Sequence, residues 1–202
     1  MADPTVREAI SRQARAWLEA NALILDTETT GLGDDAEVVE LALVDCAGAV
    51  LLDTLVRPSG PVPAEAAAIH GITDAMLAEA PTWSELHARF CDLVEGRQVV
   101  IYSREFDTRV ITQTARRYGL PAPQGFDLVL DSGRIHCAMQ AYAEFRGEWS
   151  AEKGQYRWQK LSAAAAQQGV TVTNAHRALG DCLMTLGVVR AMASTGNAQG
   201  VC

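Results

Sequence analysis

The sequence lacks several features that would place it in familiar protein classes. Its five cysteines, at positions 46, 91, 137, 182 and 202, include no C-x-x-C pair and no regular ladder, so neither a disulfide framework nor a zinc module is predicted. The charged amino-terminal segment has no apolar signal-peptide core, and no later apolar run is long enough to span a bilayer. We therefore expect an unexported, cytoplasmic protein with no membrane partner.

Lysine is also scarce, because only Lys153 and Lys160 stand among the 17 basic residues, and the net charge is −8. An acidic balance argues at first against a nucleic-acid partner, since binding to phosphates draws on basic side chains. However, carboxylates that bind metal inflate the acidic count, and bound divalent cations reverse the local field. The net charge therefore does not exclude such a partner.

A chain of 202 residues, 49% of them hydrophobic, predicts one globular domain with a sizeable core. We expect a helical extension over 1–20, a folded domain over 21–193 and a flexible tail over 194–202. Helical spacing over 5–20 precedes β-rich runs at 22–28, 37–45 and 49–56, which predict an antiparallel meander with a hairpin at 46–48. The proline- and glycine-rich stretch 57–76 is predicted to be a loop.

Strands and helices alternate after that loop. Thr82 and Glu85 form a capping box that predicts a helix start. We then expect a strand over 97–102, a helix from Glu105 to about Gly119, a fifth strand over 126–131, and helices near 134–145, 160–168 and 175–193. This order indicates an α/β fold with a mixed sheet flanked by helices.

The stretch "LILDTETTGL" at 23–32 ends an apolar strand with two acids, Asp26 and Glu28. Residues two apart in a strand share a face and lie about 6 to 7 Å apart. Their mutual repulsion raises a pKa unless a cation lies between them, and hard cations such as Mg²⁺ or Mn²⁺ take oxygen ligands. An isolated pair of this kind is more often a solvated strand end, so further acidic or basic groups are needed to favour a metal site.

Three further residues carry such groups. Asp107 stands at the head of the helix after the fourth strand, where helix capping is an alternative role. His176 precedes Asp181 by five residues near another helix start. Five helical residues turn through about 500°, so either His176 lies at or before the helix start or the two side chains approach from different sides. A lone histidine there is also explained as a capping or surface group.

Together these residues carry a family resemblance. "DTETTGL", then "FD" ending at 107, then "HRALGD" at 176–181, with "IHGIT" at 69–73, resemble the motifs of the DnaQ-like 3′→5′ exonucleases of the DEDDh type, relatives of the proofreading epsilon subunit of bacterial DNA polymerase III. Their order and spacing agree over about residues 22–190. The resemblance implies an RNase H-like fold with a mixed five-stranded sheet.

The resemblance also implies roles for the five residues. Two Mg²⁺ or Mn²⁺ ions would be bridged by Asp26, with Glu28 and Asp181 holding the ion that carries the attacking water. Asp107 would complete the shell of the second ion. His176 would be the general base that takes a proton from the water.

Nucleotide-binding residues follow from the same resemblance. The terminal nucleotide would lie against Thr29, Thr30 and Leu32, with Ile69, His70 and Phe106 near its base or sugar. Alternatively, Ile69 and Phe106 are core residues and His70 stabilises a turn. Many family members carry His-Asn before the second motif, where this chain has Tyr102-Ser103. That departure puts contacts near the terminal sugar in doubt.

The segment 146–160 interleaves Trp149, Tyr156 and Trp158 with basic residues. Aromatic faces stack on bases while cations meet phosphates, as a single-strand binder requires. Packing of this segment onto the domain is the alternative explanation.

The leading prediction is a metal-dependent exonuclease that removes nucleoside 5′-monophosphates from DNA 3′ ends, single strands in particular. The same motifs serve exoribonucleases of the RNase T and oligoribonuclease type, so RNA stays open as a substrate. A different class is an exonuclease-like interaction module of a polymerase or repair complex. The family contains both monomers and dimers, so a homodimer also stays open.

Overall fold

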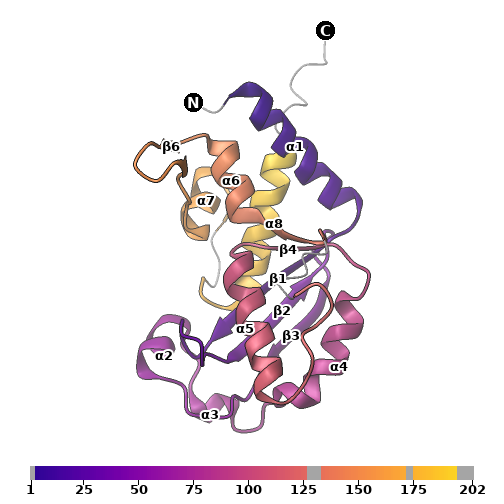
Figure 1. Ribbon diagram of the computed structural model, residues 1–202, viewed down its shortest axis with the longest axis vertical. Coiled ribbons are helices and arrows are strands. Elements are labelled where there is room, and N and C mark those ends of the chain that lie inside the picture. Colours follow the sequence, from indigo (N-terminus) through magenta and orange to yellow (C-terminus); the bar gives the residue numbers. More distant parts are fainter. Residues whose placement is uncertain (1–2, 127–132, 172–174, 195–202) are drawn as a thin grey trace.

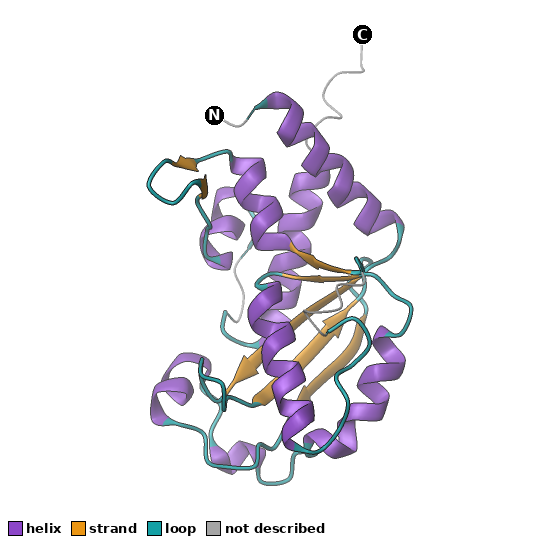
Figure 2. Ribbon diagram, in the orientation of Figure 1, coloured by secondary structure: helices purple, strands orange, loops and turns teal. Residues whose placement is uncertain are grey.

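The computed structural model describes residues 3–126, 133–171 and 175–194. Its main sheet has the strand order β3-β2-β1-β4-β5 (Figure 2). β1 pairs antiparallel with β2 and β2 with β3, whereas β4 runs parallel to both β1 and β5. The strands are β1 (Leu23–Thr29), β2 (Val38–Val44), β3 (Val50–Leu55), β4 (Val99–Ile101) and β5 (Ile135–Cys137). The mixed five-stranded sheet predicted from the sequence is therefore confirmed.

Helices cover both faces of this sheet, because apolar residues of β1 alternate between two cores. Ile24 packs in one core and Leu23 and Leu25 in the other. The core around Ile24 contains side chains of α1 (Pro4–Glu19), α6 (Ala138–Arg146), α7 (Leu161–Gln167) and α8 (Ala178–Ser194). The core around Leu23 and Leu25 contains side chains of α4 (Trp83–Val94) and α5 (Arg104–Arg117). Since successive strand side chains point to opposite faces, Asp26 and Glu28 share the face of Ile24, toward α8.

Two local predictions in the first half of the chain are confirmed. In the hairpin between β2 and β3, the Asp45 carboxylate accepts hydrogen bonds from the N–H groups of Ala47 and Ala49, each at 2.9 Å. Gly48 adopts a φ of 95° there, which suits a residue without a Cβ atom. At the start of α4, the Glu85 carboxylate accepts a hydrogen bond from the Thr82 N–H at 2.7 Å.

The prediction of a loop over 57–76 is wrong in part, because this stretch contains α2 (Ala64–His70) and α3 (Asp74–Leu77). Alanine and glutamate are strong helix formers, and their run after Pro63 outweighs the loop-like composition around it. Gly71 ends α2 in the left-handed region with a φ of 73°. Figure 1 shows α2 and α3 at the end of the molecule opposite α1.

The fifth strand lies later in the chain than predicted. The predicted strand over 126–131 falls outside the described residues except for Phe126, which is buried and lies in no helix or strand. β5 occupies 135–137, where the sequence predicts the first turn of a helix, and that helix begins only at Ala138. The buried Ile135 explains the difference, because it packs against the α4 and α5 side of the sheet rather than along a helix face.

The segment 146–160 forms a second, two-stranded sheet of β6 (Trp149–Ser150) and β7 (Gln155–Tyr156). At the carboxyl-terminal side, α8 is the helix predicted over 175–193 and begins later, at Ala178, and the predicted tail lies outside the described residues except for Ser194. Among the described helices, none has the length and apolar character needed to cross a membrane.

The α4 side of the core is packed around an aromatic cluster whose removal tests the fold. The Phe90 ring is fully buried, with its centroid 5.7 Å from that of Trp83 and 5.4 Å from that of Phe126. We expect Phe90→Ala to lower the free energy of unfolding by about 3 to 5 kcal/mol, because it removes buried apolar area and leaves a cavity. Urea unfolding measures the loss, with the exposed Arg89→Ala as control. A loss below about 1 kcal/mol would contradict this packing.

Candidate active site

The carboxyl-terminal half of β1 and the first turn of α8 bring three carboxylates together. Asp26, Glu28 and Asp181 each place one carboxylate oxygen so that all three oxygens lie within 4.8 Å of one another. Asp26 and Glu28 are half-buried on the α8 face of the sheet, and α8 packs directly along β1. Oxygen atoms at this spacing, from side chains that cannot all ionise freely, are suited to holding a hard divalent cation.

Asp107 stands in the first turn of α5, just beyond the end of β4. Because β4 runs parallel to β1, the carboxyl ends of both strands meet at the same edge of the sheet. The Thr27 hydroxyl donates a hydrogen bond of 2.7 Å to the Asp107 carboxylate. Burial nevertheless raises the pKa of Asp107 to about 7, against the opposing effect of this hydrogen bond. The side chain is thus held in place from β1 rather than exposed as a simple helix cap.

Mutual repulsion and burial dominate the electrostatics of this acidic cluster. Burial first, and then the nearby carboxylates of Asp107 and Asp181, raise the pKa of Asp26 well above its ordinary value. Burial and the carboxylates of Asp181 and Glu40 raise the pKa of Glu28 to about 8. Burial also raises the pKa of Asp181. Without a cation the cluster therefore retains protons at neutral pH, and a cation that displaced them would relieve the repulsion.

Glu40 is a site residue that the sequence reasoning missed. It is buried on β2 directly opposite Glu28 in the strand register. Its carboxylate accepts hydrogen bonds from the Arg177 Nε at 3.0 and 3.1 Å and from the Ala178 N–H at 2.8 Å. It therefore caps α8 and fixes Arg177, the residue that follows His176, while its own charge adds to the repulsion at Glu28. A glutamate within the otherwise apolar run "VVELALV" at 38–44 was the available signal, since glutamate is rarely buried without a partner.

His176 lies before the start of α8, as one of the two arrangements predicted from the helix geometry requires. Its backbone has a φ of 63°, and its N–H donates a hydrogen bond of 3.2 Å to the Asp181 carboxylate. A non-glycine residue in the left-handed region is uncommon and is retained where the surroundings enforce it. The His176 side chain is exposed and lines a cleft together with Asp181. The five predicted residues thus converge on one edge of the sheet.

The turn after β1 presents Leu32 to solvent, with 79% of the residue exposed. Thr29 and Thr30 stabilise this turn. The Thr29 hydroxyl donates a hydrogen bond of 2.8 Å to the Gly31 carbonyl, and the Thr30 hydroxyl accepts one of 2.9 Å from the Glu37 N–H. From α5, Arg109 donates hydrogen bonds to the carbonyls of Leu32 and Gly33 at 3.0 and 3.1 Å. Sequence reasoning missed Arg109, which α5 directs toward a turn 77 residues earlier in the chain.

Of the remaining predicted nucleotide-binding residues, Ile69 and Phe106 are accessible, whereas His70 is buried. Ile69 is 62% exposed at the end of α2, so it is not a core residue. Phe106 is partly buried against the α5 side of the core and also lines a cleft. His70 is buried, and its Nδ1 accepts a hydrogen bond from the Ile72 N–H at 3.0 Å, the turn-stabilising arrangement.

Tyr102 occupies the position where the sequence departs from the family pattern. Its ring is buried in the α8 core, and its hydroxyl donates a hydrogen bond of 2.8 Å to the Gln159 carbonyl. The Tyr102 carbonyl accepts the Met139 N–H at 3.0 Å. Tyr102 therefore connects β4 both to α6 and to the segment that carries Trp158.

Two solved exonuclease structures have the same fold as this chain. Exonuclease X, solved in complex with 5′-overhanging duplex DNA, aligns with a TM-score of 0.61 at 29% identity over 86% of this chain and 92% of that one. Escherichia coli Exonuclease I, solved with a dT13 oligonucleotide, shares the fold with a TM-score of 0.62 at 19% identity, over 81% of this chain and 39% of that one. The sheet and its flanking helices are thus the RNase H-like fold of exonucleases.

The family model RNase T, described as an exonuclease, matches residues 23–189. An uncharacterized exonuclease, CP81, of Escherichia phage 186 is 53% identical over 190 residues, which cover 94% of this chain and 96% of that protein. A DNA polymerase III subunit epsilon-like protein of Rhodobacter capsulatus is 35% identical over 81% of this chain but only 22% of its own length. The chain belongs to the RNase T exonuclease family, which confirms the DnaQ-like 3′→5′ exonuclease family predicted from its motifs.

The raised carboxyl pKa values predict how stability depends on pH. A carboxyl with a higher pKa in the folded state binds more protons folded than unfolded, so its contribution to stability decreases as pH rises between its ordinary and its folded pKa. For Glu28 this window runs from 4.5 to about 8. We expect the melting temperature in EDTA to fall across it more steeply for the native chain than for Glu28→Gln, and Mg²⁺ to stabilise the native chain increasingly toward pH 8. Equal slopes for the two proteins in EDTA would contradict the raised pKa.

A second prediction concerns Glu40. We expect Glu40→Ala to lower exonuclease activity by about tenfold to a hundredfold and to raise the Mg²⁺ concentration needed for half-maximal activity, because side chains that support metal ligands have effects of this size. Glu40→Gln keeps an acceptor for the Ala178 N–H and is the matched control, with a smaller expected loss. Circular dichroism monitors folding of both variants. Unchanged activity and metal dependence in folded Glu40→Ala would show that the contact to Arg177 is not needed.

Proposed function

We propose that the protein is a metal-dependent 3′→5′ exonuclease that hydrolyses phosphodiester bonds at DNA 3′ ends, preferentially single-stranded, and releases nucleoside 5′-monophosphates. The observation that carries this proposal is the group of three carboxylates within 4.8 Å at the end of the central strand, in a chain of the exonuclease family. The exposed His176 lines the same cleft as Asp181 and supplies an imidazole that can accept a proton.

The donor set fits hard divalent cations. All four acids offer oxygen, the atom that Mg²⁺ and Mn²⁺ prefer, and burial raises the pKa values of Asp26, Glu28 and Asp107, so a bound cation would stabilise their ionised forms. Asp26, Glu28 and Asp181 would hold one ion, and Asp26 and Asp107 a second. When bound, such a pair supplies positive charge to the attacking and leaving oxygens of a displacement at phosphorus.

His176 would act as the general base. Its position before α8 leaves the ring in the cleft rather than along the helix, and the hydrogen bond from its N–H to Asp181 ties the backbone to the acidic cluster. From there the imidazole accepts a proton from the attacking water. The Glu40 contacts to Arg177 and Ala178 keep this short segment in register with the strand end.

The terminal nucleotide would lie between the turn after β1 and α2. Leu32 and Ile69 are large apolar residues exposed to solvent, in the turn after β1 and at the end of α2, and Phe106 adds a ring from α5. The backbone of Thr29 and Thr30 lines the same turn. Exposed apolar side chains grouped at a catalytic edge support contact with a base or sugar.

DNA is favoured as substrate because the relatives include an epsilon-like protein of DNA polymerase III and a structure of Exonuclease X with DNA. An exoribonuclease of the RNase T or oligoribonuclease type is the second candidate, favoured by the family that the chain matches. Association with a polymerase or repair complex, and homodimer formation, do not conflict with this activity, and each calls for a binding measurement of its own.

A degradation assay with 5′-labelled DNA and RNA oligonucleotides tests the proposal. We expect Mg²⁺-dependent ladders that shorten from the 3′ end of DNA. His176→Ala should lower the rate by about a hundredfold to ten-thousandfold, the usual contribution of a general base, and Asp26→Asn should abolish metal-dependent turnover.

The control for these variants is Asp92→Asn, which removes an exposed carboxylate on α4 and should leave the rate unchanged. Activity that survives Asp26→Asn would refute the metal-bridge assignment. Faster degradation of RNA than of DNA would establish the second candidate. Inactivity on both substrates together with tight binding to a polymerase would instead establish an interaction module.

A further inference from the structure

Two adjoining hollows lie beside the acidic cluster and share Met139 and Trp158. The first, of about 540 Å³, extends from Trp158 to Phe106 and Arg109. The second, of about 500 Å³, extends from Trp158 to His176 and Asp181. We call these two hollows together the Trp158 groove. Each has the volume of a typical small-ligand pocket. The groove is thus continuous with the catalytic edge of the sheet.

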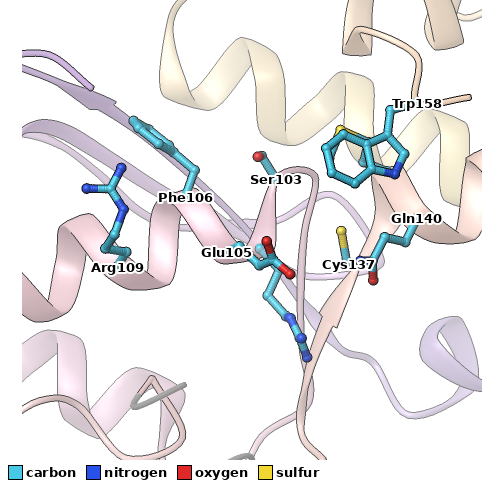
Figure 3. A pocket seen from close by; sticks show the side chains of 9 residues that line it. Ser103, Glu105, Phe106, Arg109, Cys137, Gln140 and Trp158 are labelled. Carbon is cyan, nitrogen blue, oxygen red and sulfur yellow. The ribbon is translucent and has the colours of Figure 1, made fainter. Parts of the chain in front are cut away.

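Figure 3 shows how the first hollow is arranged. Phe106 and Trp158 lie at its two ends, with Ser103 between them and Cys137 and Gln140 beside Trp158. Two aromatic rings are therefore presented along one cleft, from elements far apart in the sequence. A strand whose terminal base contacts Phe106 would meet Trp158 further along.

Trp158 is exposed although the backbone around it is fixed. The residue is 52% exposed. On one side the Arg157 N–H donates to the Glu148 carbonyl at 2.8 Å, and on the other the Tyr102 hydroxyl donates to the Gln159 carbonyl at 2.8 Å. An indole held in solvent by an ordered backbone loses little conformational entropy when a partner stacks on it.

Trp149 is similarly exposed, at 56%, but its surroundings differ. Its ring packs edge to face against Tyr156 across the β6–β7 hairpin, with centroids 5.3 Å apart. Neither residue lines the two hollows that form the groove. Of the three aromatic residues that the sequence suggested for single-strand binding, Trp158 alone faces the catalytic cleft, and the other two pack on each other.

Basic residues lie along the groove. Arg104 and Arg109 line the first hollow, and the exposed Lys160 lines the second. Lys160 is one of only two lysines in a chain of net charge −8. An aromatic ring flanked by cations is the arrangement that binds single-stranded nucleic acid, since the ring stacks on a base and the cations attract phosphates.

We propose that the Trp158 groove binds the nucleotides on the 5′ side of the scissile phosphate, with the Trp158 ring stacked on a base. This inference rests on the proposed function, because an exonuclease acting at a 3′ end leaves one nucleotide on the 3′ side, and Leu32, Ile69 and Phe106 account for it. The rest of the strand requires a separate path. The groove runs from Phe106 past Trp158 to His176 and Asp181, and it carries the charge and stacking surface that such a path needs.

Two substrates that differ in length test the inference. The nitrophenyl ester of thymidine 5′-monophosphate fills the terminal-nucleotide site and carries only a nitrophenyl group, with no base or further phosphate, on the 5′ side of the scissile phosphate, whereas a single-stranded hexadeoxynucleotide extends along the groove. We expect Trp158→Ala to raise KM for the hexanucleotide by about tenfold to a hundredfold, the effect of losing one base–aromatic stack, and to leave hydrolysis of the ester unchanged. Trp158→Phe should restore most of the loss, and Trp149→Ala is the matched control.

Binding of a 5′-fluorescein-labelled hexanucleotide in EDTA, followed by anisotropy, gives a readout independent of catalysis. Weaker binding by Trp158→Ala than by Trp149→Ala supports the inference even if neither substrate is hydrolysed, in which case the proposed function alone fails. Equal effects on the ester and the hexanucleotide, or no effect on hexanucleotide KM and binding, would refute the groove as a strand path. Sedimentation tests the alternative that the groove is a dimer interface. If Trp158→Ala converts a dimer to a monomer and leaves hexanucleotide binding unchanged, the strand path is refuted and the groove is an interface between copies of the chain.

Discussion

The constraint on which the rest of the structure depends is the repulsion among carboxylates held at one edge of the sheet. Asp26, Glu28 and Asp181 lie within one another's reach, and their partial burial weakens the screening of their charges by water. Such a cluster destabilises the chain unless packing elsewhere compensates. The two cores on either side of β1 supply that packing, since both are filled with fully buried aliphatic and aromatic side chains. Apolar packing on both sides of the sheet thus holds the mutually repelling carboxylates in place, as a cation-binding site requires.

Three separate elements must agree in position for the cluster to form. β1 provides two acids through the period of a strand, α5 provides Asp107 through its start beside β1, and α8 provides Asp181 from its first turn. In the approach to α8, His176 adopts a left-handed conformation. Glu40 fixes it from β2, by accepting hydrogen bonds from Arg177 and from the first N–H of the helix. One buried glutamate therefore relates the segment that carries His176 to the strand end.

The sequence was sufficient where local periodicity determined the outcome, and insufficient where tertiary contacts did. Alternation in β1 predicted that Asp26 and Glu28 share a face, and the five-residue spacing of His176 and Asp181 required the histidine to leave the helix or approach from another side. By contrast, the role of Glu40 depends on its register opposite Glu28 and on a helix 138 residues later, which no local pattern contains. β5 was misplaced because three residues are too short a run to distinguish a strand from the first turn of a helix.

The departure at Tyr102 shows how catalysis and strand recognition are distributed over different parts of the fold. The acids are positioned by elements of the central cores, whose packing tolerates little change. Trp158 instead belongs to the short segment that contains β6 and β7. The Tyr102 hydroxyl joins this segment to the end of β4 by its hydrogen bond to the Gln159 carbonyl. A histidine at position 102 would end short of that carbonyl, so the tyrosine and the placement of the segment belong together. The tyrosine that departs from the family motif thereby fixes the backbone beside Trp158.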